Sequence, residues 1–263
     1  MKYILLTGAY GGMGRAVTRA LADSGYFVFA LDKNVGDAED NVMPIKADLT
    51  RSEDVDAALA QIREHTDSLF AVLHFAGIYM LDSLVEMSEE SFAKIFNINL
   101  FGVYRVTRAA MPLLGRGSRI VITTSELAPL DPLPFTGIYA VTKSALDKYA
   151  YSLRMELQLL GIKVSVLRPG AVSTDMLGVS TSALDRFCER TEMYACNAKR
   201  FKKIVESVEA RSISPEKVAR RTLRILRAKS PRYVYSINRN PLLLMLAMLP
   251  KRLQTAIIKL VLK

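Results

Sequence analysis

A glycine-rich turn directly after a short apolar run is the feature that most limits how this chain can fold. The segment Thr7-Gly8-Ala9-Tyr10-Gly11-Gly12-Met13-Gly14 follows the apolar run 3–6, and an amphipathic helix is expected from residue 12 onward. Glycines let the backbone approach a ligand closely, and the free N–H groups at the start of a helix attract an anion. The order of strand, glycine turn and helix therefore predicts a phosphate-binding unit at the start of the chain.

The rest of the chain alternates predicted strands and helices. Strands are expected at 2–7, 26–31, 42–47, 69–75, 119–124, 162–167 and 232–237, and helices at 12–24, 52–64, 88–114, 139–160 and 215–228. The run 69–75 is nearly all apolar, which is typical of a strand covered by helices on both faces. We therefore predict an α/β fold with a Rossmann-type, doubly wound parallel sheet of seven strands, helices on both faces and a single domain.

The domain organisation follows from the absence of linkers, repeats and low-complexity tracts in the sequence. We expect one Rossmann-fold domain over 1–240, with a substrate lid at 175–214, and a basic, apolar helical extension over 241–263. The first apolar stretch is too short for a signal peptide, so we expect a cytoplasmic protein. Cys188 and Cys196 lack a metal or redox spacing, and two histidines make no zinc cluster, so no metal site is expected.

Charge is distributed unevenly along the chain. From Arg186 onward there are 19 Lys/Arg and 5 Asp/Glu, whereas the first 185 residues carry 17 and 21. The segment 241–250 is apolar, and 251–263 alternates Leu or Ile with Lys or Arg. Its apolar part is shorter than the roughly 20 residues that span a bilayer. Three roles stay open for it: contact with an anionic membrane surface, closure of a substrate pocket, or packing on a partner subunit. No nucleic-acid reader motif is present, so no nucleic-acid partner is expected.

An acidic residue follows the second predicted strand. Asp32 lies 18 residues after Gly14, near the spacing of the carboxylate that binds the ribose of a dinucleotide. A carboxylate there repels a 2′-phosphate, and Gly11 leaves no cation before Gly12 to bind one. Lys33 is the contrary sign, because its charge could offset Asp32. The pattern favours NAD over NADP; the alternative is that Asp32 is an ordinary solvated turn residue.

A second motif lies far along the chain. Tyr139 and Lys143 are four residues apart on a predicted helix and share one face, and Ser125 follows the fifth predicted strand. A free tyrosine has a pKa near 10, and we expect the ammonium, in a partly desolvated cleft and with a positively charged nicotinamide beside it, to lower the pKa of Tyr139 toward neutrality. The Ser125 hydroxyl can bond to a substrate oxygen at the carboxyl edge of the sheet. The three residues predict an acid/base centre for an alcohol or a ketone, although the Tyr/Lys spacing alone also occurs on solvated helices.

In this order and at this separation, the motifs resemble those of the short-chain dehydrogenase/reductase family over nearly the whole chain. The resemblance implies an adenine contact at Asp48, a proton relay through water at Asn99, and a nicotinamide site at the Pro169-Gly170 turn and Thr174. The implied catalytic residues are Asn99, Ser125, Tyr139 and Lys143. The cofactor-binding residues that we predict are Thr7, Gly8, Gly11, Gly12, Met13, Gly14, Asp32, Asp48, Leu49, Phe75, Ala76, Gly77, Tyr139, Lys143, Pro169, Gly170, Val172 and Thr174.

Two positions depart from the family pattern. The N-N-A-G motif after the fourth strand reads His74-Phe75-Ala76-Gly77, so both amides are lost, and His74 is expected to be a core residue and not a catalyst. The spacing of 14 between Ser125 and Tyr139 is one residue longer than usual, which we assign to the Pro-rich loop 129–134. Thr124 is the less favoured substitute for Ser125.

The resemblance implies an NAD(P)-dependent oxidoreductase, with NAD favoured, that interconverts a secondary alcohol and a ketone through Tyr139. The lid carries large apolar residues that either line a pocket for a bulky substrate such as a steroid or retinoid, or pack the lid helices: Met176, Leu177, Leu184, Phe187, Met193 and Tyr194. A homodimer or homotetramer is the family expectation. The alternative from another class is a non-catalytic dinucleotide-binding sensor or scaffold, motivated by the altered motif at His74.

Overall fold

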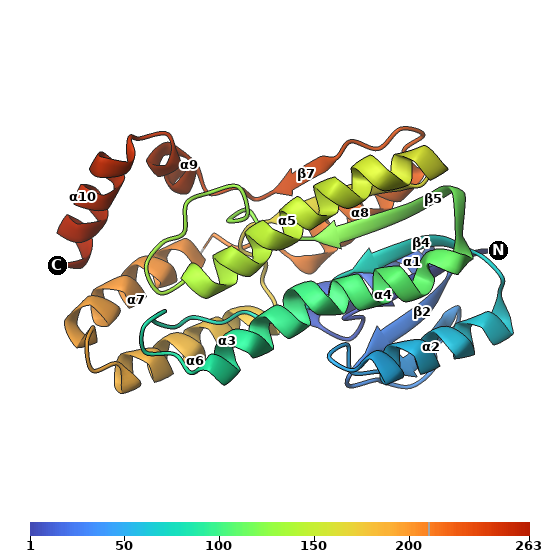
Figure 1. Ribbon diagram of the computed structural model, residues 1–263, viewed down its shortest axis with the longest axis horizontal. Helices are drawn as coiled ribbons and strands as arrows, with labels where there is room; N and C mark the ends of the chain where they lie inside the picture. The colour runs from blue at the N-terminus through green and yellow to red at the C-terminus, as the bar shows by residue number, and fades with distance from the viewer. Residues whose placement is uncertain (210) are drawn as a thin grey trace.

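A parallel seven-stranded sheet forms the centre of the protein. The computed structural model describes residues 1–209 and 211–263, without the side chains of 175–182 and 206–209. Within this part the strand order is β3-β2-β1-β4-β5-β6-β7, as predicted for a doubly wound fold (Figure 1). The strands are β1 Lys2–Thr7, β2 Tyr26–Asp32, β3 Val42–Lys46, β4 Leu69–His74, β5 Leu114–Thr123, β6 Lys163–Pro169 and β7 Val234–Ile237.

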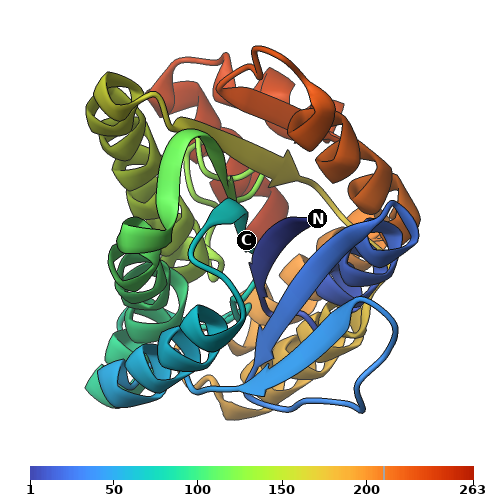
Figure 2. The same cartoon turned by 90° about the vertical axis from the view of Figure 1, so that its right-hand side faces the viewer.

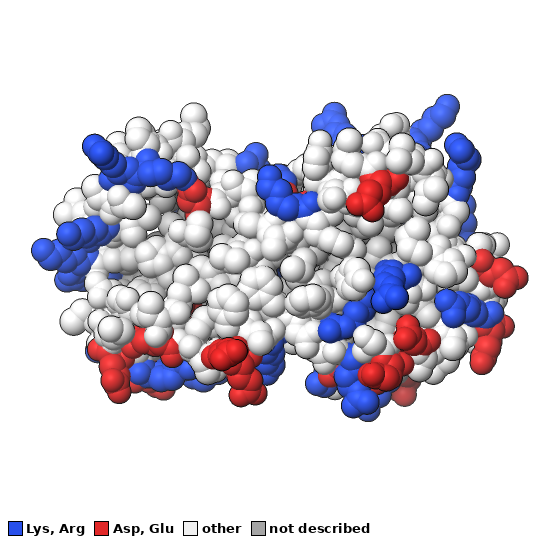
Figure 3. Space-filling view, in the orientation of Figure 1, with Lys and Arg blue, Asp and Glu red and all other residues white. Residues whose placement is uncertain are grey.

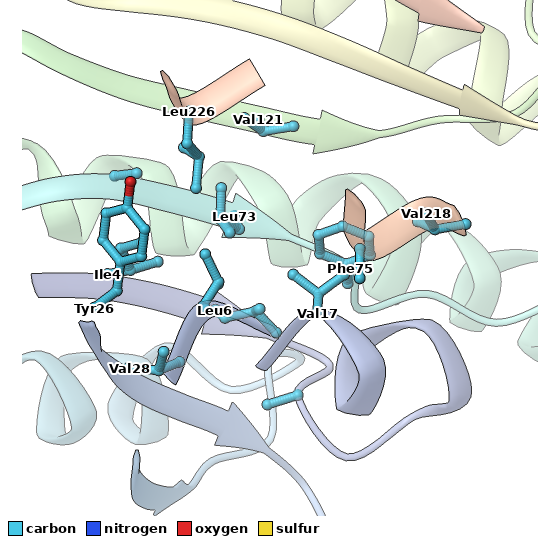
Figure 4. Close-up of a cluster of buried hydrophobic side chains, with 14 of the residues drawn as sticks. Ile4, Leu6, Val17, Tyr26, Val28, Leu73, Phe75, Val121, Val218 and Leu226 are labelled. Atoms are coloured by element: carbon cyan, nitrogen blue, oxygen red, sulfur yellow. The ribbon is translucent and has the colours of Figure 1, made fainter. Parts of the chain in front are cut away.

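Helices cover both faces of the sheet (Figure 2). On one face lie α1 (Gly12–Asp23) and α8 (Pro215–Arg227), and on the other lie α2 (Ser52–His65), α4 (Gly102–Ala110) and α5 (Gly137–Leu157). Figure 4 shows the first interface, where strand side chains such as Leu6 and Leu73 meet Val17 of α1 and Val218 of α8. Apolar side chains on both sides of the sheet exclude water, which explains the nearly continuous apolar strand sequences.

The strand order determines where a ligand can bind. The chain crosses from β3 to the far side of β1 before it forms β4, so β1 pairs with β2 on one side and with β4 on the other. Loops after neighbouring strands on either side of such a switch point leave toward opposite faces and open a crevice between them. The glycine turn after β1 and the segment after β4 lie at this crevice, and the segments after β5 and β6 continue along the same edge.

The prediction of one long helix over 88–114 is wrong, because the helix is interrupted in its middle and ends early. It consists of α3 (Glu89–Phe96), a π-helical turn (Asn97–Phe101), α4 and a 3-10 turn (Met111–Leu113). Pro112 lies in that last turn, and a proline lacks the N–H that continues a helix. The next strand consequently begins at Leu114, five residues earlier than predicted. The π-helical turn contains Asn99, one of the predicted catalytic residues.

The lid helices and the chain terminus pack together at the carboxyl end of the sheet (Figure 1). Here α6 (Asp175–Arg190) and α7 (Ala195–Glu209) meet α10 (Lys251–Leu262), while α9 (Pro241–Ala247) connects α10 to the sheet. Leu262 belongs to a buried cluster with Phe187 and Phe201, and Asn197 Nδ2 donates a hydrogen bond to Leu262 O at 2.6 Å. Lys251 forms an ion pair with Asp131. None of the helices described has the length and apolarity needed to cross a bilayer.

Candidate active site

At two positions of the turn after β1, the backbone is so close to neighbouring backbone atoms that only glycine fits. Gly8 has φ of +71°, and a Cβ atom there would lie 2.5 Å from the backbone nitrogen of Ala76. A Cβ on Gly14 would overlap the carbonyl oxygen of Gly8. By contrast, a Cβ on Gly11 would meet only that same oxygen, at an ordinary 3.5 Å. Gly11 is the N-cap of α1 and offers no side-chain cap, so the first N–H groups of α1 are left for an anion.

A cleft of about 1020 Å³ opens beside this turn. This volume is at the upper end of the roughly 300–1,000 Å³ of cofactor and small-molecule sites, so the cleft and its glycine turn fit a dinucleotide. Most of the predicted cofactor residues line it: Gly8, Gly11, Gly12, Met13, Gly14, Asp32, Asp48, Leu49, Phe75, Ala76, Gly77 and Thr174. Thr7 does not line it; its backbone oxygen accepts from Phe75 N at 3.0 Å, and thus holds β4 against β1.

Two carboxylates line this cleft. Asp32 accepts backbone hydrogen bonds from Tyr10 N at 3.0 Å and from Asn34 N at 3.3 Å. Asp48 accepts from Thr50 and from Lys33 Nζ at 2.9 Å, and these hydrogen bonds lower the pKa of Asp48 to about 2. The charge of Lys33 is therefore directed at Asp48 and not at Asp32.

A second, smaller cavity holds the predicted catalytic residues. Its volume is about 230 Å³, and Ser125, Tyr139 and Lys143 line it. Four more of the predicted residues complete its wall: Pro169, Gly170, Val172 and Thr174. The same five residues border both spaces, namely Met13, Phe75, Gly77, Ile78 and Thr174. The dinucleotide cleft and the catalytic cavity therefore adjoin at the carboxyl ends of β1 and β4.

The tyrosine, lysine and serine are close together inside this cavity. Tyr139 and Lys143 lie one turn apart on α5, and Lys143 Nζ is 5.7 Å from the centre of the Tyr139 ring. Lys143 Nζ donates a hydrogen bond to Thr123 O at 3.2 Å, and Ser125 is hydrogen-bonded to the Tyr139 hydroxyl. Thr124 points elsewhere, because its hydroxyl donates to Asp147 Oδ1 at 3.4 Å. Ser125 is thus the hydroxyl that meets the phenol.

Burial, and not the neighbouring ammonium, dominates the ionisation of this pair. It raises the pKa of Tyr139 to about 12, against the opposing effect of the hydrogen bond with Ser125, and lowers the pKa of Lys143 to about 8. Lys143 alone does not bring the pKa of Tyr139 toward neutrality, because a dry environment disfavours both charged forms; the added effect of a positively charged nicotinamide stays a prediction. Tyr139 therefore keeps its proton at neutral pH, and is a proton donor until another positive charge is added to the cavity.

Asn99 supports the cavity from behind. Its side chain is buried and forms two hydrogen bonds with the backbone of Ile78: Nδ2 donates to Ile78 O at 3.0 Å, and Oδ1 accepts from Ile78 N at 2.8 Å. Nδ2 also donates to Thr142 Oγ1 at 3.2 Å on α5. The side chain thus fixes the wall next to Gly77 and Lys143, while its role in a proton relay stays a prediction.

The altered motif after β4 leaves a histidine in the core. His74 is buried, its Nε2 lies 3.1 Å from Thr107 Oγ1, and burial lowers its pKa to about 3. The neighbouring Phe75 packs into the core cluster of Figure 4 and borders both cavities. Its burial confirms that His74 is a core residue, but its hydrogen bonding is only half satisfied, because Nδ1 has no partner among the described residues.

For Leu184, Phe187 and Tyr194, the structure favours the second of the two roles that the sequence left open, packing of the lid helices. Leu184 and Phe187 pack in the buried cluster with Leu262, and Met193 is exposed, while the side chains of Met176 and Leu177 lie outside the described part. Side chains that the sequence analysis did not single out line the cavity: Tyr79, Glu126, Leu127, Leu133, Phe201, Ile204, Val205 and Leu243. Glu126 was the one that could have been found, because it directly follows Ser125.

Comparisons with known proteins agree with this architecture. The family model described as short chain dehydrogenase matches residues 2–185. The chain is 26% identical over 229 residues to the 3-ketodihydrosphingosine reductase of Bacteroides thetaiotaomicron, with 87% of this chain and 84% of that protein covered. It is 32% identical over 191 residues to the Estradiol 17-beta-dehydrogenase 2 of Mus musculus, with 67% of this chain covered; the match spans half the length of that relative.

A solved structure shows the same fold. The crystal structure of a short chain dehydrogenase family protein from Francisella tularensis subsp. tularensis SCHU S4 superposes with a TM-score of 0.76 at 24% identity. The alignment covers 90% of this chain and 97% of that one. The likeness therefore extends well beyond the glycine turn and the first strands.

Proposed function

This chain belongs to the short-chain dehydrogenase family, and we propose that it is an NAD-dependent oxidoreductase that interconverts a secondary alcohol and a ketone. One observation carries the proposal: Tyr139, Ser125 and Lys143 line a buried cavity that shares its border residues with a dinucleotide-sized cleft. A reaction between a cofactor and a substrate needs two such adjoining sites. A bound nicotinamide would supply or accept the hydride.

Tyr139 acts as the acid/base in this proposal. In ketone reduction it donates its proton to the substrate oxygen, while the Ser125 hydroxyl holds that oxygen. Lys143 stabilises the phenolate that remains, because its ammonium is on the same side of α5. In alcohol oxidation the pKa of Tyr139, about 12 in the protein alone, must fall, and the positive charge of an oxidised nicotinamide would act in that direction.

The preference for NAD is supported by Asp32. Its carboxylate lines the cleft, and the nearest lysine, Lys33, pairs with Asp48 instead. We expect Asp32→Asn to raise the ratio of kcat/KM with NADP to that with NAD by at least about 10-fold, since an unpaired carboxylate repels the 2′-phosphate. The ratio is measured with both cofactors and one alcohol. If Asp32→Asn has the same ratio as the wild type, Asp32 does not determine the preference for NAD.

A bulky hydrophobic substrate, such as a steroid or retinoid, fits the lining of the cavity. Apart from the catalytic residues, the wall is mainly aliphatic and aromatic, with Leu127 and Leu133 from the loop after β5, Phe201 from α7 and Leu243 from α9. The names of the two relatives, an estradiol dehydrogenase and a ketodihydrosphingosine reductase, point the same way. A panel of steroid, retinoid and small polyol alcohols tests this, and turnover limited to the polyols would refute it.

Tyr139→Phe separates an enzyme from a non-catalytic dinucleotide sensor. We expect turnover to fall by at least about 1,000-fold, because the proton donor is lost, while cofactor affinity changes little. Turnover is followed by cofactor absorbance and binding by calorimetry. Tyr151→Phe, on the exposed side of α5, is the matched control and should turn over like the wild type. A sensor would show no turnover in either protein and equal binding in both.

We also propose that the protein is a homodimer or homotetramer through α4 and α5. These helices lie on the face shown in Figure 3, which is uncharged over much of its centre. Large apolar side chains are exposed there, including Phe101, Tyr104, Val141 and Met155. Light scattering of the wild type and of Tyr104→Glu tests this, because a charge at the centre of an apolar interface should dissociate it.

The terminal helices support a further proposal, that a cytoplasmic enzyme docks on membranes through them. Leu242, Met245 and Met248 are exposed along one side of α9, and the segment after 238 has five basic residues and no acidic one. The inner side of α9 contributes Leu243 to the cavity, so pocket closure and membrane contact can coexist. Replacing the three exposed residues by Gln should reduce co-sedimentation with anionic vesicles; equal sedimentation would discard membrane contact.

A further inference from the structure

A carboxylate faces the catalytic cavity beside the proton-transfer residues. Glu126 follows Ser125 at the end of β5 and lines the same 230 Å³ space as Tyr139. Among the described residues that line this space, it is the only acidic side chain, and Lys143 is the only basic one. The reaction proposed above uses Lys143 and leaves Glu126 without a part.

Backbone contacts hold this carboxylate in place. Glu126 Oε2 accepts a hydrogen bond from Asn240 N at 2.6 Å, and Glu126 N donates to Pro169 O at 2.9 Å. On the other side, Oε1 lies against Gly170, where a Cβ atom would come within 2.8 Å of Oε1 and within 2.0 Å of the Asn238 backbone oxygen. One oxygen is thus tied to the residue that precedes α9, and the other lies against the Pro169-Gly170 turn in the cavity wall.

Among the described residues, no cation forms an ion pair with this group. Lys143 Nζ donates to Thr123 O, and no ion pair involving Glu126 occurs in the described part of the chain. Arg239 is exposed and interacts with Glu126 only by Coulomb attraction, without an ion-pair contact. Desolvation raises the pKa of Glu126, and the Asn240 hydrogen bond and Arg239 oppose that rise. A partly desolvated, unpaired carboxylate is unfavourable, and a cation brought by a ligand would relieve that cost.

We infer that Glu126 recognises a cationic amino group of the substrate, so that the enzyme acts on long-chain amino alcohols or amino ketones. The inference rests on the proposed function, since it concerns the same cavity. The leucines and Phe201 in the wall would take the hydrocarbon chain, Tyr139 and Ser125 the reacting oxygen, and Glu126 the ammonium. A charged group paired with an ammonium in a water-poor cavity provides strong discrimination against a neutral analogue of equal size.

Two alcohols test this directly. The first is a long-chain secondary alcohol with an amino group on the carbon next to the carbinol, and the second is the matched diol, in which a hydroxyl replaces the amine. Their oxidation is measured at pH 7 as a ratio of kcat/KM values, amine over diol. We expect the wild type to prefer the amine, and Glu126→Gln to lower the ratio at least about 10-fold, or about 1.4 kcal/mol.

The choice of glutamine separates recognition from structure. Its amide oxygen can still accept from Asn240 N, so the contact with the start of α9 is kept while the charge is lost. Glu64→Gln, on the surface of α2, is the control for loss of one negative charge, and should leave the ratio as it is. A ratio that is the same in the wild type and in Glu126→Gln would overturn the inference.

A measurement on the wild type alone covers the case in which Glu126→Gln does not fold. A long-chain primary amine should inhibit diol oxidation at least about 10-fold more strongly than the primary alcohol of the same length; equal inhibition would also overturn the inference. Failure of the proposed function has a different signature, because the wild type would then oxidise neither the amine nor the diol. Oxidation of the diol with no preference for the amine rejects only the role of Glu126.

Discussion

The dinucleotide cleft and the catalytic cavity adjoin, yet they are built in different ways. The cleft has a volume of about 1020 Å³. At the end that would hold the pyrophosphate, its wall is formed by backbone atoms of the glycine turn and of the first turn of α1. The cavity is about 230 Å³ and its wall is mostly side chains, including Phe201 of α7 and Leu243 of α9. Charges in the cleft are solvated or paired, as in Lys33 with Asp48, whereas in the cavity Lys143 is buried and Tyr139 partly buried.

This difference separates two ways of forming a site. Local backbone geometry forms the glycine-turn end of the cleft, so the tolerance of that end to substitution depends on whether a Cβ atom fits at each glycine. Burial by distant elements forms the cavity, and its chemistry depends on how far that burial shifts two pKa values. We therefore expect steric substitutions to affect the cleft most, and changes of charge to affect the cavity most.

The largest effect is expected from a single methyl group in the cleft. Gly14→Ala should weaken NAD binding at least about 1,000-fold, or about 4 kcal/mol, because its Cβ overlaps the Gly8 carbonyl and must displace the turn. Gly11→Ala is the matched control three residues earlier, where a Cβ makes an ordinary 3.5 Å contact, and its affinity should stay within a few-fold of the wild type. Calorimetry measures binding and circular dichroism confirms the fold. Equal losses in both variants would contradict the steric account.

In the cavity, replacing Lys143 should have opposite effects on stability and on activity, and the change in free energy is smaller than the one expected for Gly14→Ala. Burial lowers the pKa of Lys143 from 10.5 to about 8, so the folded protein at pH 7 holds an ammonium that would be better solvated in the unfolded chain. Lys143→Met should therefore abolish turnover yet raise the free energy of unfolding by about 3 kcal/mol at pH 7, at roughly 1.36 kcal/mol per unit of pKa shift.

The pH dependence identifies the cause of that gain. The wild type should become more stable as the pH rises from about 8 to 10.5, because over this range the unfolded chain binds a proton at residue 143 that the folded protein has released. The advantage of Lys143→Met should shrink over the same range in urea titrations. Lys148→Met, on the exposed side of the same helix, is the control and should show no such trend. A destabilised Lys143→Met would mean that the hydrogen bond to Thr123 outweighs burial.

The same difference explains what the sequence could reveal. The seven strands, the parallel sheet and the glycine turn follow from short-range patterns, namely apolar runs, glycine spacing and the period of α1. The sequence also placed Tyr139 and Lys143 on one helix face, since that needs only the helical repeat. The interrupted helix at 88–114 was missed because its apolar periodicity continues through the π-helical turn at Asn99, and Pro112 was not weighed as a stop signal.

The ionisation of the catalytic pair could not be obtained in this way. The expected fall in the pKa of Tyr139 counted the charge of Lys143, which is near in sequence. It treated desolvation only as strengthening that charge, whereas burial by elements as distant as β4, α7 and α9 also disfavours the phenolate itself. The two roles that the sequence left open for the lid residues could not be separated for a related reason, since only distant contacts show that Leu184 and Phe187 pack against the chain terminus and not on the cavity. Composition alone does not distinguish the two uses.

The smallest effect is expected at His74, which ends β4 where the two sites meet. Burial lowers its pKa from 6.5 to about 3, so the unfolded chain takes up a proton that the folded protein refuses as the pH falls below 6.5. The wild type should lose about 1.4 kcal/mol of unfolding free energy per pH unit from this residue, about 2 kcal/mol between pH 6.5 and 5. His74→Asn should lack this component, whereas His65→Asn, on the surface of α2, should keep it. Urea titrations at several pH values measure how the free energy of unfolding changes with pH. Equal slopes in all three proteins would mean that His74 takes up a proton in the folded protein. Its surroundings would then be more accessible to water than the catalytic cavity.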